Sequence, residues 1–389
     1  MIVFNQVGKG TYWRAFHLGR CLAHRGHSVT LMAMSPTARL RLHEREVDGI
    51  HLVETPDLLS GPLRSGWDLW DAFRRIAWLN GRTFDIVHAF EARPVVLMPA
   101  LAAQRRGAKL VMDWCDWFGR GGSVEERPSR IARFILRFVE TYFEERFRVR
   151  AEGTTVINSV LRERAIGLGV RPESILLIRN GSNTSVVPLE RLTARRILGL
   201  PLHTPLIGFV GGIYQRDAEL MASALNRVQQ TAPDVRLLLV GYFNRRIEAW
   251  LDDPSAVMRT GVISSEQLYQ YLASCEVCWL PLCNSGANRG RWPLKLNDYM
   301  TVGRPVVATE VGDLGEVIRE HHLGVVTPDN ADSFAEQTLT LLNDGERRES
   351  VGRAARRAAE DVFNWERLAG DLEVFYRRVV AFHTHVQGA

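Results

Sequence analysis

Short apolar runs alternate with longer segments of helical periodicity along most of the chain. After an opening strand, three runs in the first part have the length and composition of buried strands: residues 28–34, 84–90 and 108–114. A helix is predicted after the opening strand, because apolar side chains recur there at helical spacing: Trp13, Phe16, Leu18 and Leu22. This alternation predicts a parallel sheet with helices on both faces.

A polar, proline-containing segment, 178–205, interrupts the pattern and is interpreted as a linker. A second series of short apolar runs follows it: 206–212, 235–242, 257–263, 276–282, 304–312 and 324–327. We therefore expect two doubly wound α/β domains, residues 1–184 and 185–364, facing each other across a cleft. An amphipathic helix over 365–385 is expected to pack back on the first domain. Ligands of such sheets bind at the carboxyl ends of the strands.

Composition adds limits on partners and compartment. The chain has 389 residues and a net charge of +5, but its 49 basic side chains are interspersed with 44 acidic ones. No free basic block is present, so a nucleic-acid partner is not expected. The opening residues lack a signal-peptide pattern, and five cysteines, an odd number, fit a reducing compartment. A cytoplasmic protein is expected, with the inner face of a membrane as a second location.

Three of the cysteines lie close together in the segment CEVCWLPLC: Cys275, Cys278 and Cys283. A zinc site would need a fourth ligand, and no histidine lies nearby in the sequence. The segment is therefore interpreted as a buried strand, and no metal site is expected.

Residues 291–318, RWPLKLNDYMTVGRPVVATEVGDLGEVI, contain Lys295, one of only three lysines in the chain. Pro293 suits the first turn of a helix and Gly303 suits its C-terminal cap. Lys295 and Asp298 would then share one helix face. They could form an ordinary surface ion pair, worth only a few tenths of a kcal/mol. Alternatively, the ammonium and the first-turn backbone N–H groups could bind a diphosphate.

The order and spacing of this segment match the pattern P-x-K-x-x-E-Y-M-x-x-G-x-P-V-V-A-T-x-x-G of a known family. With the segments LLIRNGSN, LIGFVGGIYQRDAELM and VRLLLVG, the chain resembles the retaining group 1 (family 4) glycosyltransferases over nearly its whole length. The resemblance implies the GT-B fold of two Rossmann-like domains. It also implies sugar transfer from a nucleotide diphosphate sugar to a glycan, lipid-linked or small-molecule acceptor, without a metal ion or cofactor.

The resemblance assigns donor-binding roles in the second domain. Lys295 would bind the diphosphate, and Asp298 would accept hydrogen bonds from the ribose diol, where the family carries glutamate. Two positions depart from the family: Gly290 replaces a first glutamate, and Gly212 replaces an arginine. Residues near these departures become the candidates for the sugar and the diphosphate: Asn288, Arg289, Gly211 and Arg216. The departures bear on donor choice and on activity itself.

The first domain carries weaker signals. Gly8, Lys9 and Gly10 form a glycine loop after the opening strand, where a donor phosphate or the acceptor could approach the backbone, although a tight turn also favours glycine. His88 ends a predicted strand and is a catalytic candidate, with a structural histidine as the alternative. Asp116 follows the next strand and is the second catalytic candidate.

Residues 130–152 interleave arginine with phenylalanine and isoleucine. Such a helix could lie on an anionic membrane, or it could pack into the core with a basic outer face. Two other functions also remain open. The chain could be a nucleotide-sugar epimerase or hydrolase of the same fold, or a non-catalytic paralogue that only binds a nucleotide sugar.

Overall fold

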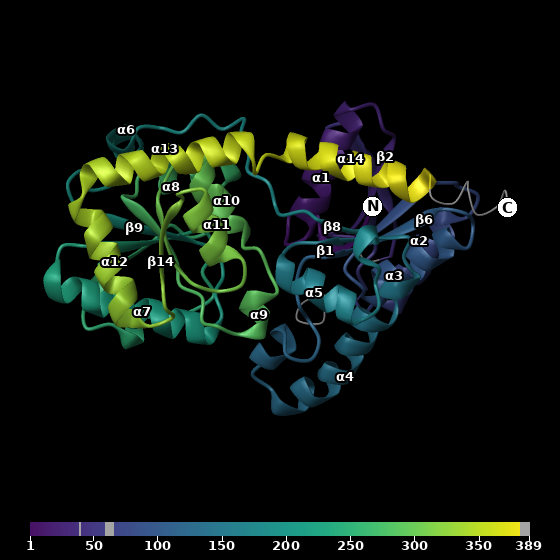
Figure 1. Cartoon of the computed structure of the whole chain (residues 1–389), viewed down its shortest axis with the longest axis horizontal. Helices are drawn as coiled ribbons and strands as arrows, with labels where there is room; N and C mark the ends of the chain where they lie inside the picture. Colours follow the sequence, from purple (N-terminus) through teal and green to yellow (C-terminus); the bar gives the residue numbers. More distant parts are fainter. Residues whose placement is uncertain (39, 59–65, 382–389) are drawn as a thin grey trace. The chain divides into compact units, whose positions relative to one another are not determined.

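The computed structural model describes residues 1–38, 40–58 and 66–381. The chain divides into two compact units. The first comprises Met1–Arg179, Gly290–Trp292 and the segment that begins at Trp365, and the second comprises Asn180–Arg289 and Pro293–Asn364. Each unit is built on one sheet covered by helices on both faces (Figure 1). The predicted pair of doubly wound α/β sheets is thereby confirmed.

The first unit has an eight-stranded sheet in the order β3-β4-β2-β1-β5-β6-β7-β8. Helix α14 packs against α1, and the expected continuation of α14 to residue 385 lies outside the described residues. The elements are β1 (Ile2–Gln6), α1 (Tyr12–His24), β2 (Val29–Met34), β3 (His43–Val47), β4 (Ile50–Thr55), α2 (Leu69–Leu79), β5 (Ile86–Phe90), α3 (Pro94–Gln104), β6 (Lys109–Trp114), α4 (Arg130–Arg146), β7 (Gly153–Val156), α5 (Ser159–Gly167), β8 (Ile175–Leu177) and α14 (Trp365–Ala381).

The pair β3 and β4 was not predicted from the sequence, and it is the antiparallel part of this sheet. Its strands are joined by Asp48 and Gly49, which have φ angles of 50° and 78°. Two successive residues with positive φ form the tight turn that suits the twist of a hairpin. Most residues of β3 are polar and exposed. The strand therefore forms one edge of the sheet and buries neither of its faces.

The second unit has a six-stranded parallel sheet in the order β11-β10-β9-β12-β13-β14. Its elements are α6 (Arg191–Leu198), β9 (Leu206–Val210), α7 (Gln215–Thr231), β10 (Arg236–Val240), β11 (Val257–Arg259), α8 (Ser265–Ala273), β12 (Val277–Leu280), α9 (Gly286–Arg289), α10 (Leu294–Thr301), β13 (Val306–Thr309), α11 (Leu314–Glu320), β14 (Gly324–Thr327), α12 (Ala331–Asn343) and α13 (Gly345–Asp361).

Helix α6 lies in the segment interpreted as a linker, where no helix was predicted. The carboxylate of Glu190 accepts hydrogen bonds from the backbone N–H groups of Leu192 and Thr193, which caps the first turn. Gly199 closes the helix in the left-handed conformation, with a φ of 64°. These two caps stabilise a helix that is too short to show a clear apolar period.

Strand order places one topological switch point in each unit. In the first sheet β1 lies between β2 and β5, and in the second β9 lies between β10 and β12. The connections on the two sides of such a point run in opposite directions, and ligands of such sheets bind there, at the carboxyl ends of the strands. The loops after β1 and β5, and those after β9 and β12, are therefore positioned to carry functional groups.

A buried ion pair fixes the helix that follows the first of these loops. The guanidinium of Arg14 on α1 bonds both carboxylate oxygens of Asp113 on β6, at 3.0 Å each. The same guanidinium donates to the backbone carbonyl of Ile178 at 2.8 Å. Arg14 and Asp113 are both buried, so water cannot solvate either charge if the other is removed. The pair therefore holds α1 firmly against β6.

We predict that Arg14→Met lowers the free energy of unfolding by about 3–5 kcal/mol, because Asp113 is left as an uncompensated buried charge. The double variant Arg14→Met/Asp113→Asn should recover part of this loss, since an amide is less costly to bury than a carboxylate. Chemical denaturation of the two variants measures both effects. Equal losses in the single and the double variant would show that the charge pair is not the cause.

Candidate functional site

The loop after β9 lies at the topological switch point of the second unit. Gly211 has a φ of 74°, a backbone conformation that residues other than glycine rarely adopt. Asn244 braces the loop, because its amide accepts from the backbone N–H of Ile213 at 2.9 Å and donates to the carbonyl of Ile213 at 3.2 Å. Gly212, which lies between Gly211 and Ile213, is exposed. The loop therefore presents backbone groups rather than side chains to a ligand.

Lys295 reaches this loop from the first turn of α10. Its ammonium donates to the carbonyl of Gly212 at 3.0 Å and lies 3.9 Å from the centre of the Phe209 ring. The structure therefore brings Lys295 and Gly212, two of the donor-binding candidates, into contact. The Phe209 ring and the Gly212 carbonyl, both uncharged, hold the ammonium in place.

Asp298 lies one turn further along α10 and is half-buried. Burial raises the pKa of its carboxyl to about 7, although the nearby hydroxyl of Tyr269 and the charge of Lys295 oppose this shift. The Tyr269 hydroxyl donates to Asp298 Oδ1 at 3.4 Å. Tyr269, on α8, was not among the predicted site residues, because nothing in its local pattern indicates that α8 and α10 meet.

The loop after β12 is held by an acidic residue in the first turn of α7. Asp217 accepts from the backbone N–H of Cys283 at 2.7 Å and from the side-chain amide of Asn288 at 2.9 Å. Asn288 is buried, so its amide group is used to shape the loop. Arg216 and Arg289 are exposed, at the start of α7 and at the end of α9. Both side chains are therefore accessible to solvent.

In the first unit, the glycine loop after β1 also has a steric reason for its composition. Gly8 and Gly10 have φ angles of 80° and 56°. A Cβ atom on Gly10 would lie 2.7 Å from the side-chain nitrogen of Asn5, whose oxygen accepts from the backbone N–H of Thr11. Lys9 is exposed, and its ammonium donates to Gln6 at 3.0 Å. The loop thus has a structural need for glycine that is independent of any ligand.

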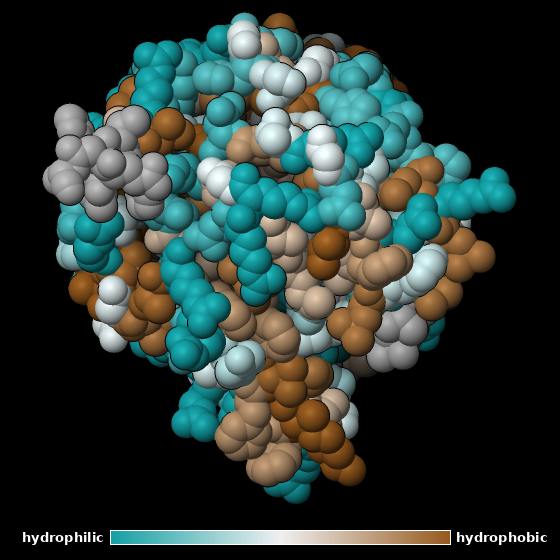
Figure 2. All heavy atoms as spheres, turned by 90° about the vertical axis from the view of Figure 1, so that its right-hand side faces the viewer, coloured by the Kyte–Doolittle hydropathy of each residue, from teal (hydrophilic) through white to brown (hydrophobic). Residues whose placement is uncertain are grey.

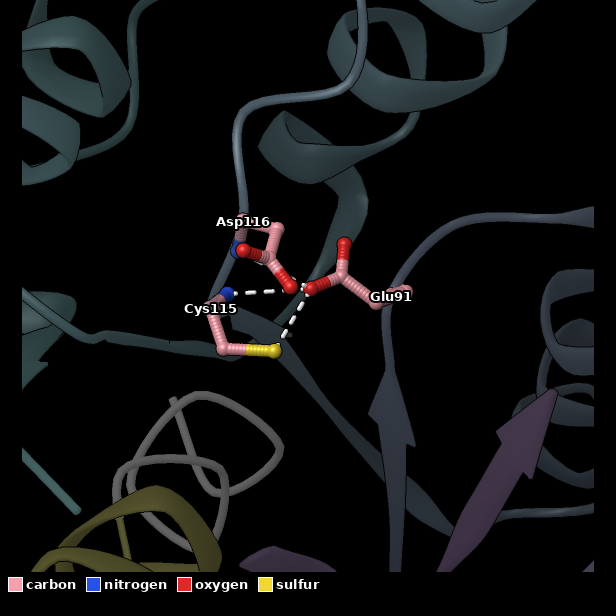
Figure 3. Close-up of side chains that lie close together, drawn as sticks. All are labelled: Glu91, Cys115 and Asp116. Carbon is pink, nitrogen blue, oxygen red and sulfur yellow. Dashed lines mark hydrogen bonds between the residues drawn. The ribbon is translucent and has the colours of Figure 1, made fainter. Parts of the chain in front are cut away.

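Three side chains meet at the carboxyl ends of β5 and β6: Glu91, Cys115 and Asp116 (Figure 3). Glu91 has a φ of 74° and is buried. Its Oε1 atom accepts from the backbone N–H groups of Cys115 and Asp116, at 3.1 and 3.2 Å, and from the Cys115 thiol at 2.7 Å. Burial and the adjacent Asp116 raise the pKa of Glu91 to about 8, and burial raises the pKa of Asp116 to about 6. Glu91 is therefore mainly protonated at neutral pH.

The structure does not bring His88 to this group. His88 lies in the middle of β5, buried, with one ring nitrogen 2.6 Å from the Tyr376 hydroxyl and the other 3.0 Å from the Thr155 hydroxyl. Burial lowers its pKa to about 3, so the ring is neutral. The residue that reaches the carboxyl end of β5 is Glu91, which sequence reasoning missed. Its signal was its place as the first polar residue after the strand.

The ligand atoms of Glu91, Cys115 and Asp116 lie within 4.8 Å of one another, close enough to hold a metal ion. Their chemistry argues against it. Burial and the neighbouring carboxyl groups raise the pKa of the Cys115 thiol well above its ordinary value. The thiol therefore keeps its proton and donates a hydrogen bond to Glu91. A metal ion would have to displace this proton and compete for the Glu91 oxygen that already accepts three hydrogen bonds. We assign no metal to this group.

Comparison with known proteins identifies both units. The family model described as "Glycosyl transferases group 1" matches residues 204–344, and the model described as "Glycosyl transferase 4-like domain" matches residues 9–181. The MMP alpha-(1->4)-mannosyltransferase of Mycolicibacterium hassiacum is 26% identical to the chain, and the match covers 96% of the chain and 95% of that protein.

Solved structures show the same fold. Sucrose-phosphate synthase from Thermosynechococcus elongatus matches with a TM-score of 0.74 and 20% identity, over 96% of this chain and 94% of that one. Anabaena Alr3699/HepE, solved in complex with UDP-glucose, matches with a TM-score of 0.65 and 15% identity, over 98% of both chains. Both matches span the two units, so the similarity covers the whole architecture.

We predict that Glu91→Gln changes how stability depends on pH. The folded pKa of about 8 lies above the ordinary value of 4.5, so the folded state binds more protons than the unfolded state between these values. Stability contributed by the protonated group is therefore lost as pH rises through this window, by at most about 1.4 kcal/mol per pH unit. Glu91→Gln removes the titrating group and should flatten this fall.

Denaturation between about pH 5 and pH 8 measures the slope. Glu316→Gln, which removes an exposed carboxylate on α11, is the matched control and should keep the wild-type slope. An unchanged slope in Glu91→Gln would mean that Glu91 titrates normally in the folded protein.

Proposed function

Because the chain belongs to the group 1 glycosyltransferases, which use nucleotide sugars, we propose that it transfers a hexosyl group with retention of anomeric configuration. The donor would be a nucleotide diphosphate sugar, and the acceptor a hydroxyl group of a glycan, a lipid-linked sugar or a small molecule. The contact between Lys295 and the Gly212 loop carries this proposal. It brings the one lysine of the family motif to the loop after β9.

The donor diphosphate is assigned to the loop after β9 and the start of α7. Free backbone N–H groups at a helix N-terminus and an adjacent ammonium both favour an anion. Lys295 supplies the ammonium, and Arg216, exposed in the first turn of α7, is assigned as the second cation. Binding of a diphosphate would draw the Lys295 ammonium away from the Gly212 carbonyl, exchanging a neutral acceptor for a charged one.

The nucleoside and the sugar are assigned to the neighbouring groups. Asp298 accepts from the ribose diol, and this favours its ionised form against the burial that raises its pKa. Tyr269 then orients the carboxylate from the other side. The donor sugar is assigned to the loop after β12, near Arg289, while Asn288 positions that loop. The mannosyltransferase relative and the UDP-glucose complex of the structural neighbour support a hexose as the transferred group.

The acceptor is assigned to the first unit, at the loops that hold Gly8, Lys9 and Gly10 and at the Glu91–Asp116 edge. Asp116 is the catalytic candidate here, whereas the partners of His88 support a structural role. Retention without a protein nucleophile requires the leaving phosphate to assist the incoming hydroxyl on the same face of the sugar. The protein then contributes by positioning the reactants and by stabilising the diphosphate charge.

We predict that Lys295→Ala weakens binding of a nucleoside diphosphate by about 2–4 kcal/mol, because a charge-assisted contact is lost. The melting temperature should change little, since the side chain is only partly buried. Calorimetric titration with UDP and GDP measures the affinity. Lys109→Ala, at the start of β6 in the other unit, is the matched control and should bind as wild type does. Unchanged affinity in Lys295→Ala would remove the phosphate role.

Transfer should also persist in excess chelator, because the diphosphate charge is met by Lys295, Arg216 and backbone N–H groups. The rate should fall as salt is added, since ions screen these cations. Product formation from a panel of nucleotide sugars and acceptors, followed with and without EDTA, tests both statements. A rate that collapses on chelation and returns with magnesium or manganese would contradict the assignment. Release of nucleotide without acceptor would indicate a hydrolase instead.

A further inference from the structure

Helix α4 turns its apolar side toward solvent. Five large side chains on it are exposed, by fractions from 53% to 75%: Ile131, Phe134, Ile135, Phe138 and Tyr142. Their spacing places them along one face of the helix, and we call this set the α4 stripe. The lower end of the face drawn in Figure 2, where α4 lies in Figure 1, is largely brown and tan. The alternative that this helix packs its apolar side into the core is wrong for the stripe.

The opposite face of α4 is acidic and buried. Glu144 accepts from the indole N–H of Trp114 at 2.8 Å and from the backbone N–H groups of Phe118 and Gly119 at 2.8 and 2.6 Å. Glu140 is buried against the guanidinium of Arg93 at 3.0 Å. Rotating α4 to bury the stripe would separate both carboxylates from their hydrogen-bond and ion-pair partners. The outward direction of the stripe is therefore fixed by the fold.

Positive charge surrounds the stripe. Four arginines on α4 and beside it are exposed, and none forms an ion pair with a residue that the structure describes: Arg120, Arg130, Arg146 and Arg150. Arg120 lies over the ring of Phe138, at 5.9 Å. Two acidic neighbours are already neutralised, because Glu125 pairs with Arg137 and Glu145 with Arg164. The face as a whole is apolar at its centre and cationic at its rim.

We propose that the α4 stripe inserts into the interfacial region of an anionic lipid bilayer and holds the protein on the membrane surface. Phenylalanine and isoleucine bury apolar area among the acyl chains, and the arginines contact lipid phosphates. A second copy of the chain is a poorer occupant, because it would place two cationic rims against each other. Within the described residues, no helix is long and apolar enough to cross a membrane, so this contact is peripheral. The proposal does not depend on the donor or the acceptor of the reaction.

Vesicle flotation tests the proposal with the full chain. The probes are vesicles of phosphatidylcholine alone and vesicles of phosphatidylcholine mixed equally with phosphatidylglycerol. Wild-type protein should float with the anionic vesicles and remain behind with the neutral ones. The triple variant Ile131→Ser/Phe134→Ser/Phe138→Ser should lose about tenfold or more of this binding while keeping its melting temperature, since these side chains contribute little to the core.

A matched control removes three exposed apolar side chains from the second unit: Val187→Ser, Ile197→Ser and Val262→Ser. This variant should bind vesicles as the wild type does. The proposal is overturned if the wild type fails to float with anionic vesicles, or if the α4 variant floats equally well. It is also overturned if the wild type forms a dimer that the α4 variant lacks and vesicles bind neither protein, because the stripe would then be a contact between copies.

Discussion

The ammonium of Lys295, 3.0 Å from the carbonyl of Gly212, connects the elements on which the proposed donor site depends. It brings the first turn of α10 to the loop after β9, at the position where the strand order of the second sheet reverses. Parallel pairing of β9 with both β10 and β12 is what makes this contact geometrically available. The positive end of α7 starts at the same loop. One cation, one glycine loop and one helix terminus therefore meet at the carboxyl end of β9.

Four of the acids described above differ in whether an arginine forms a hydrogen bond to the carboxylate. Asp113 is buried, yet the bidentate contact with Arg14 holds its pKa below the ordinary value, so it stays ionised and ties α1 to the sheet. Glu91, Asp116 and Asp298 lack such a partner among the hydrogen bonds described above, and burial raises the pKa of each. Glu91 and Asp116 lie just beyond β5 and β6, and Asp298 lies on α10.

Much of this architecture could be predicted from the sequence, because apolar runs of strand length are direct consequences of burial on both faces of a sheet. The helix over Leu294–Thr301 also followed from its proline and glycine caps. Three features escaped for physical reasons. The β3–β4 hairpin depends on an Asp48–Gly49 turn beside a strand that is mostly polar, and α6 buries a charged side chain, Arg195, so its segment looks polar in the sequence.

The third feature is the direction in which side chains face, which periodicity does not determine. Residue spacing indicated an apolar stripe on α4, but only the buried contacts of Glu140 and Glu144 show that the stripe faces outward. Likewise, His88 lies within one apolar run and Glu91 directly follows it, and only the structure shows that Glu91 is the one that meets Cys115 and Asp116.

The most direct test of the account is a crystal structure of the full chain with a bound nucleoside diphosphate. The account predicts the diphosphate at the start of α7, within hydrogen-bond distance of the Lys295 ammonium and the backbone N–H groups that follow Gly211, with the ribose on Asp298. A nucleotide bound elsewhere, with Lys295 still donating to Gly212, would contradict it.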